Sequence, residues 1–198
     1  MEFGEVVVRR RSIRKFREDP VSDELLNKIL EAGRWAPSAG NTQPWHFIVV
    51  TKPEVKQGIA RACTESSKKA WSQFPPERAK YLAQRGGSWD KSAMAKIPAL
   101  VAVCYETPER IREDLALGST WTAIQNMLLA ATTEGLGSCI YTFYDTNEEE
   151  KLKEILKVPE RYRMAAIIQL GYSRIDPPSP SRKKLEDIVS HQYFHQEP

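Results

Sequence analysis

Two short stretches of the chain carry residue types suited to binding a charged or planar ligand. The first, Arg10-Arg11-Ser12-Ile13-Arg14, follows a segment typical of a short helix over residues 3–9. Alternate side chains of an extended segment point the same way, so Arg10, Ser12 and Arg14 are expected to share one face. Guanidinium groups form bidentate, charge-assisted hydrogen bonds with phosphate. The pattern predicts a site for a phosphate monoester; a solvated basic run or a nucleic-acid contact is the alternative.

The second stretch is Pro37-Ser38-Ala39-Gly40-Asn41-Thr42-Gln43-Pro44-Trp45-His46-Phe47, which runs directly into apolar residues 48–50. Ser38, Asn41 and Gln43 can donate and accept hydrogen bonds, and Gly40 lets the backbone approach a ligand closely. Such groups could bind the edge of a planar heterocycle. The alternative is a loop whose polar side chains satisfy only their own backbone.

Two further motifs bear on the same question. Ser181-Arg182-Lys183-Lys184 is a second basic cluster, which could close an anion site from the other end of the chain. Glu134-Gly135-Leu136-Gly137-Ser138 follows a helical pattern and precedes a strand, the reverse of the order in a dinucleotide-binding fingerprint. We therefore interpret these glycines as structural, with Gly135 ending the helix in a left-handed conformation.

Metal and hydrolytic chemistry have little support. His191 and His195 have i, i+4 spacing but no carboxylate nearby, so no metal site is expected. The sequence contains no P-loop, nucleophile elbow or HExxH motif. Cys63, Cys104 and Cys139 are odd in number and far apart, and we interpret them as small apolar core residues rather than a disulfide framework.

The composition is that of an ordinary globular protein. The chain has 198 residues, 41% of them apolar and 28% charged, which suits one domain over residues 1–198 and argues against disorder. The apolar run over residues 97–105 is too short to span a bilayer, and the N-terminus does not resemble a signal peptide, so we expect a cytoplasmic protein. The net charge is only +3, although six of the nine residues 9–17 are basic. That balance argues against nucleic acid as the partner.

The apolar periodicity predicts an α+β fold. Ser22 is placed to cap one helix and Thr146 another, the latter in a capping box with Glu149. Residues 72–92 are ambiguous, and the tail carries apolar residues that should pack on another surface. The expected helices cover residues 3–9, 23–33, 52–71, 114–133 and a segment from 146, and the expected strands cover residues 45–51, 98–105, 138–144 and 163–170.

The order of these motifs resembles the nitroreductase family. The matching elements are the segment of residues 10–14, the stretch of residues 36–47, the glycine pair of residues 135–138, and Leu170-Gly171-Tyr172 leading to Arg182-Lys183. The resemblance spans nearly the whole chain, and Asn-x-Gln-Pro-Trp is its most specific part. It implies a mostly antiparallel central sheet flanked by helices, and an intertwined homodimer in which residues 172–198 form an arm on the partner subunit.

The resemblance also implies FMN at the dimer interface, reduced by NADH or NADPH and reoxidised by a second substrate. Arg10 and Ser12, beside Arg11, would hold the ribityl phosphate, and Arg14 would lie near the pyrimidine edge. No side chain need be catalytic, because the flavin supplies the redox chemistry. The other implied cofactor-binding groups are Arg182 and Lys183 at the phosphate, the main chain of Tyr141 and Thr142 at flavin N5, and Pro37, Ser38, Ala39, Asn41 and Gln43 from the other subunit.

The chain also departs from the family pattern. Ala39 stands where many relatives carry a second serine, and Thr142 and Phe143 occupy positions that are often small. Residues 71–89 correspond to no motif of the family pattern, and we interpret them as a candidate lid that selects substrates. We expect ping-pong reduction of nitroaromatics, quinones or similar small acceptors, with no nucleic-acid or membrane partner. The alternatives are dehalogenating or flavin-consuming chemistry, flavin binding without turnover, or a basic nucleic-acid-binding module.

Overall fold

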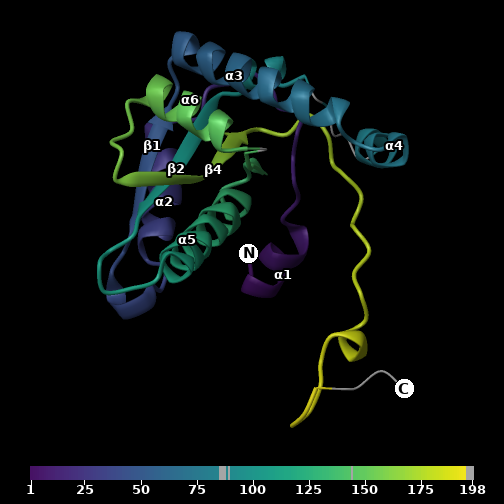
Figure 1. Cartoon of the computed structure of the whole chain (residues 1–198). Helices are drawn as coiled ribbons and strands as arrows, with labels where there is room; N and C mark the ends of the chain where they lie inside the picture. Colours follow the sequence, from purple (N-terminus) through teal and green to yellow (C-terminus); the bar gives the residue numbers. More distant parts are fainter. Residues whose placement is uncertain (85–87, 89, 144, 195–198) are drawn as a thin grey trace.

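A computed structural model describes residues 1–84, 88, 90–143 and 145–194. A four-stranded antiparallel sheet lies at its centre, in the order β1-β2-β4-β3, with helices on both faces (Figure 1). The predicted α+β fold, with an antiparallel sheet flanked by helices, is therefore confirmed. The strands are β1 (Trp45–Val50), β2 (Ala99–Glu106), β3 (Gly137–Tyr141) and β4 (Tyr162–Gly171).

Strand β2 is covered on both faces, as its apolar run predicts. Val101 and Val103 pack with α2 (Asp23–Arg34) and α5 (Glu113–Thr133). Leu100 and Ala102 face the opposite way, toward α3 (Pro53–Ser72) and α6 (Thr146–Leu156). The period-two alternation of a strand thus divides the core into two layers.

The ends of α2 and α5 confirm two sequence predictions. The hydroxyl of Ser22 accepts a hydrogen bond from Leu25 N at 3.3 Å and caps α2. Gly135 has a φ of +77°, the left-handed conformation expected where α5 ends. The chain then turns directly into β3, so α5 positions the start of that strand.

The predicted cap of α6 is wrong by one residue. Asp145, not Thr146, is the N-cap, and its carboxylate accepts a hydrogen bond from Glu148 N at 2.8 Å. Glu149 forms no capping box, because its carboxylate binds Arg163 and Met164 N. Strand β3 also ends at Tyr141, earlier than predicted, and the predicted end at Tyr144 lies outside the described residues.

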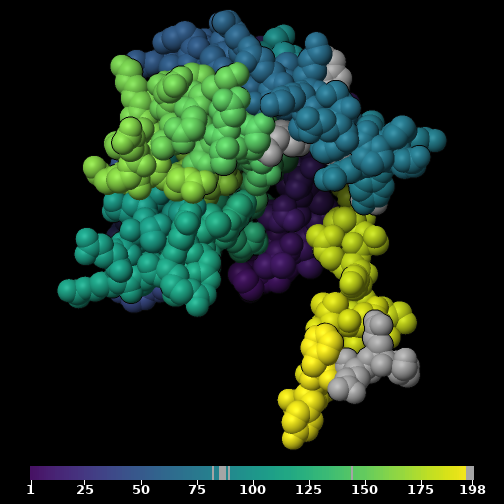
Figure 2. Space-filling model, in the orientation of Figure 1, coloured from purple at the N-terminus to yellow at the C-terminus, as the bar shows by residue number. Residues whose placement is uncertain are grey.

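Two segments project from the body (Figures 1 and 2). One is α4 (Pro76–Gln84), which lies in the part of the chain that the periodicity left ambiguous. The other is the C-terminal arm, residues 172–194. Its first residues still pair with residues 15–17 of the body, and its end exposes 85% of Tyr193 and 91% of Phe194. Packing of this arm on a partner stays a prediction. The remaining short elements are α1 (Phe3–Arg9), η1 (Ala39–Asn41), η2 (Ser92–Lys96) and η3 (Leu185–Asp187).

Cys63, Cys104 and Cys139 are free and buried, as interpreted from the sequence. Within the described ranges, no helix combines the length and apolar character needed to cross a bilayer, and no group of three or more metal-binding side chains gathers. His195 lies outside the described residues, so the His191 pairing is not described.

Candidate functional site

The basic N-terminal segment runs beside the edge strand β3. Ile13 N donates a hydrogen bond to Ser138 O at 2.9 Å, and Ser12 forms a parallel bridge with Ser138. A Cβ atom at Gly137 would lie 2.8 Å from Cγ1 of Ile13, too close for a side chain. The glycine therefore permits the approach that places residues 10–14 against β3, in line with its structural interpretation.

Arg14 lines a cavity of about 200 Å³ together with Tyr141, Cys139 and Gln169. Two residues predicted to serve the same ligand, Arg14 and Tyr141, thus meet at one cavity. Lys91 also lines it and was not predicted. No sequence signal separates this lysine from the other basic residues around the ambiguous segment. The further lining residues are Ser88, Asp90, Ala93, Met94, Ile97 and Ile140.

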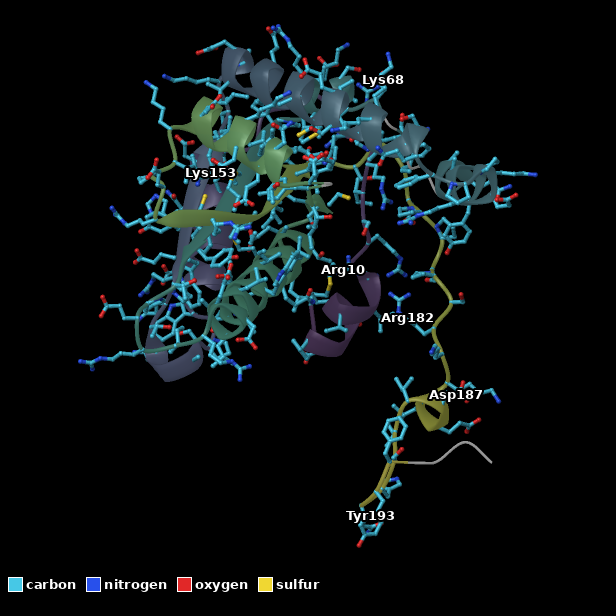
Figure 3. All side chains as sticks on the ribbon, viewed as in Figure 1. Arg10, Lys68, Lys153, Arg182, Asp187 and Tyr193 are labelled. Carbon is cyan, nitrogen blue, oxygen red and sulfur yellow. The ribbon has the colours of Figure 1, made fainter. Side chains whose placement is uncertain are left out.

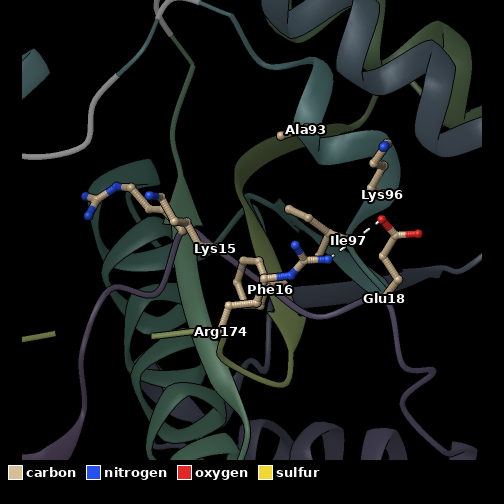
Figure 4. Close-up of a pocket in the computed structure, with 8 residues that line it drawn as sticks. Lys15, Phe16, Glu18, Ala93, Lys96, Ile97 and Arg174 are labelled. Atoms are coloured by element: carbon tan, nitrogen blue, oxygen red, sulfur yellow. Dashed lines mark ion pairs between the residues drawn. The ribbon is translucent and has the colours of Figure 1, made fainter. Parts of the chain in front are cut away.

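Arg14 also lines a second cavity of about 260 Å³, which Figure 4 shows. Lys15, Lys96 and Arg174 line it, and Arg174 forms an ion pair with Glu18 at 3.9 Å. These exposed cations extend the positive surface beyond the Arg14 cavity. A mainly positive surface attracts anionic ligands from solution and speeds their association.

The two ends of the chain meet at Arg11. Its guanidinium donates to Ser179 Oγ at 2.6 Å and to Arg10 O at 2.9 Å, and it also contacts Val8 O. Arg11 and Arg182 line one cavity of about 270 Å³, beside the end of α1 where Figure 3 shows Arg10. The two basic clusters therefore approach each other, and their binding of one common anion stays a prediction. Lys183 follows on the exposed arm.

Two buried polar atoms near this region have no hydrogen-bond partner among the described residues: Arg11 Nε and Ser138 Oγ. Buried polar groups in folded proteins are nearly always hydrogen-bonded. Ser138 is only 2% exposed, so water cannot easily reach its hydroxyl. A buried hydroxyl without a hydrogen bond costs free energy. Both atoms are therefore free to form a hydrogen bond with a group from outside the described part of the chain.

The loop of residues 37–43 holds an unusual backbone. Gly40, Asn41 and Gln43 have φ values of 57°, 53° and 47°. Positive φ is uncommon outside glycine and costs energy, and such strain is concentrated at functional sites. Ser38 Oγ accepts a hydrogen bond from Gln43 N at 3.0 Å, so this serine also serves its own loop. Asn41 and Gln43 are exposed, as is Pro37, whereas Ala39 is half-buried.

Within one chain, this loop and the Arg14 cavity lie at different ends of α5. Ala39 N donates to Ser119 Oγ at 3.0 Å, and Thr122 Oγ1 donates to Pro37 O at 2.9 Å, which anchors the loop to the first half of the helix. From Thr122 to the helix end the axis rises roughly 16 Å, at about 1.5 Å per residue. The structure therefore does not bring the two predicted halves of the site together in a single copy.

A buried polar group lies behind the Arg14 cavity. Tyr141 Oη donates to Glu148 Oε1 at 2.5 Å, and Ser67 Oγ lies 3.3 Å from the same hydroxyl. Burial raises the pKa of Tyr141 well above its usual value, so the phenol stays protonated. Sequence reasoning missed Glu148, because an acidic residue in the first turn of a helix is ordinarily explained by the helix dipole.

Thr142 is the last of the predicted site residues, and its side chain is exposed. It follows β3 and lines a cavity of about 410 Å³ with Trp121, Phe143 and Arg163. Tyr141 and Thr142 therefore lie on neighbouring cavities at the end of the edge strand. Aromatic groups are more abundant around Thr142, and cations around Arg14.

Comparison with known proteins agrees with this geometry. The family model described as "Nitroreductase family" matches residues 7–172. The iodotyrosine deiodinase of Thermotoga neapolitana is 31% identical over 94% of this chain and 95% of that protein. The NADH dehydrogenase of Thermus thermophilus is 29% identical over 92% of each chain. The crystal structure of an oxidised iodotyrosine deiodinase bound to FMN and 3-iodo-L-tyrosine has a TM-score of 0.87 at 26% identity, covering 98% of this chain and 100% of that one.

Proposed function

This chain belongs to the nitroreductase family, a family of FMN-dependent oxidoreductases, and from that premise we propose that it transfers electrons from NADH or NADPH to a small electron-poor acceptor. The observation that best supports this proposal is the bridge between Ser12 and Ser138, which places a basic segment along the edge strand. The likeness to an NADH dehydrogenase supports a nicotinamide donor.

The hydrogen-bond donors of the basic segment and of the arm suit the phosphate and the ring edge of FMN. Its phosphate needs charge-assisted donors, and Arg10, Ser12 and the arm residues Arg182 and Lys183 would supply them. The orphaned hydroxyl of Ser138 is a further donor within the same region. Arg14 would lie at the pyrimidine edge, where its guanidinium could donate hydrogen bonds to the C2 carbonyl oxygen and to N1.

Bound FMN would supply the hydride chemistry, while this chain's residues would position it. Arg14 would stabilise the negative charge that reduction places near N1 and the C2 carbonyl. The main chain of Tyr141 and Thr142 would face N5, at the end of an edge strand that the sheet holds rigidly. No side-chain nucleophile is required by this scheme.

We further propose that the working site needs two copies of the chain. Residues 37–43 of one copy would complete the cavity of the other, because the loop lies far from the Arg14 cavity of its own chain. The arm supports this, since Leu185, Tyr193 and Phe194 expose apolar surface that a partner would bury. A homodimer with two equivalent sites satisfies both observations.

Reductive dehalogenation is a second candidate. Iodotyrosine deiodinases are among the proteins similar to this chain, both by sequence and by structure. The Arg14 cavity also carries Lys91, a second cation that suits an acceptor bearing an anionic group. The two candidates share the flavin and differ in the acceptor.

The test is a visible spectrum of the purified protein, followed by anaerobic addition of NADH or NADPH. Flavin absorbance that bleaches with either nicotinamide supports the proposal. The reduced protein is then mixed with a nitroaromatic, a quinone and 3-iodo-L-tyrosine, and reoxidation by the iodinated acceptor with iodide release favours dehalogenation. A protein that stays colourless after incubation with FMN would contradict both candidates.

A further inference from the structure

We propose that Glu148 is an ionised carboxylate behind the flavin site, which acts through Tyr141 and against Lys91 to set the reduction potential of the bound flavin. The inference rests on the proposed function for the presence of a bound flavin. The negative charge of Glu148 is inferred from the contacts of its side chain. It makes Glu148 a positioning residue, because it touches neither cofactor nor substrate.

The surroundings of Glu148 stabilise an anion. Its side chain is fully buried, and it accepts a hydrogen bond from Tyr141 Oη at 2.5 Å. Glu148 is the third residue of α6, in the first helical turn, where the dipole favours negative charge. A buried carboxylate is tolerated where donors and positive potential replace water.

Tyr141 connects this acid to the cavity. The same ring that carries the hydroxyl also lines the Arg14 cavity, and Lys91 Nζ lies 5.6 Å from the ring centroid. The Lys91 ammonium therefore faces one side of the ring, while the Glu148 carboxylate binds its hydroxyl. One aromatic ring separates the buried charge from the ligand cavity.

Asp90 also lines the cavity, but it is exposed to solvent and accepts a hydrogen bond from Ser92 N, so Glu148 is the main buried anion. From α3, Cys63 is fully buried, and burial together with the Glu148 charge raises its pKa, so the thiol stays neutral. Burial likewise raises the pKa of Cys139 on β3. On its own helix, Asp145 caps the backbone of Glu148 and Glu149 is bound by Arg163.

Lys91 and Arg14 are the cations on the cavity side. Burial lowers the pKa of Lys91, while the Glu148 charge acts in the opposite direction and helps to keep the ammonium protonated. The two cations favour a reduced, anionic flavin, and Glu148 opposes them. In a site shielded from water, one such charge has a large effect on the equilibrium between oxidised and reduced flavin.

The expected effect of Glu148→Gln is a tenfold or greater shift toward reduced flavin at a fixed potential. For a two-electron couple this is about 30 mV toward more positive potential. Glutamine keeps the shape and the hydrogen-bond acceptor, so only the charge changes. The midpoint would be measured by spectroelectrochemistry, with Glu150→Gln as the matched control, because Glu150 lies on the same helix with a side chain 62% exposed. Wild-type potentials in both variants would overturn the inference.

Tyr141→Phe provides a second variant should Glu148→Gln fail to fold. It removes one hydrogen-bond donor to the carboxylate, which then takes up a proton more readily, so a smaller positive shift is expected that grows as the pH falls. A shift that is independent of pH, or none, contradicts the proposed role. The opposite substitution, Lys91→Met, is expected to lower the potential.

A measurement on the flavin-free protein separates this inference from the proposed function. In protein labelled with ¹³C at the lysine ε-carbon, the Lys91 resonance is titrated by NMR and assigned with Lys91→Met. Loss of the Glu148 charge should lower the Lys91 pKa measurably, because the carboxylate favours the charged ammonium. An unchanged titration in Glu148→Gln overturns the inference whether or not flavin binds. A colourless wild type defeats the proposed function instead, and the titration alone then decides whether Glu148 is an anion acting on the cavity.

Discussion

Ile13 occupies the space where a side chain at position 137 would stand. A Cβ atom built on Gly137 lies 2.8 Å from Cγ1 and 2.9 Å from Cβ of Ile13. The near atoms include the branched Cβ, which cannot swing away as the end of a flexible side chain can. This contact sets how closely the basic segment approaches β3, and thereby where Arg10, Ser12 and Arg14 lie.

We predict that Gly137→Ala displaces the segment of residues 10–14. Overpacking of this kind typically costs about 1–3 kcal/mol, and FMN affinity should fall at least tenfold because the donors move. Urea unfolding and flavin content measure the two effects. Gly118→Ala in α5 is the control, since no atom lies within 4 Å of its Cβ position and alanine favours a helix. Normal FMN affinity in Gly137→Ala would show that the close approach does not serve the ligand.

The second prediction concerns the arginines themselves. Arg10→Ala with Arg14→Ala removes two charge-assisted interactions of about 1.5–3 kcal/mol each, so the FMN dissociation constant should rise 100-fold or more while the fold persists. Lys15→Ala with Arg17→Ala deletes the same charge from the same basic run and is the matched control. Equal losses in the two double variants would mean that the segment attracts FMN only by its overall charge.

Local patterns in the sequence predict much of this fold. The unbroken apolar run of β2 indicates a strand buried on both faces, and Gly135 is recognisable as a helix end. The predicted N-cap of α6 is wrong because the side chains of Asp145 and Thr146 can both cap a helix. Only the packing of the folded chain decides that Asp145 does so. The roles of Lys91 and Glu148 could not be predicted, since they arise where Tyr141 meets residues far away in the sequence.

Stability at acidic pH should depend on Glu149. Burial alone would raise the pKa of this carboxyl, but hydrogen bonds from Arg163 and Met164 N lower it below its ordinary value. The folded state therefore binds this proton less readily than the unfolded state. The resulting stabilisation is complete above the ordinary glutamate pKa and is lost as the pH falls through the lower, folded-state pKa.

We therefore predict that Glu149→Gln loses about 1–3 kcal/mol at pH 7 and that the difference from wild type shrinks toward acid pH. Urea unfolding between pH 7 and pH 3 measures it. Glu150→Gln, whose exposed carboxylate pairs with Lys153 at 3.4 Å, should change stability little at any pH. A constant difference between Glu149→Gln and wild type across this range would contradict the assignment.

The last prediction tests whether two chains build each site. Asn41→Gly with Gln43→Gly removes both side chains of the 37–43 loop, and glycine is chosen because these residues hold positive φ. This variant and the Arg10→Ala, Arg14→Ala variant should each bind FMN poorly alone. Co-expressed with different tags and purified as the mixed dimer, they should regain up to half of the wild-type flavin content. One of the two sites then combines the intact arginines of one chain with the intact loop of the other. If each site were built within one chain, both chains of the mixed dimer would stay defective and no flavin would return.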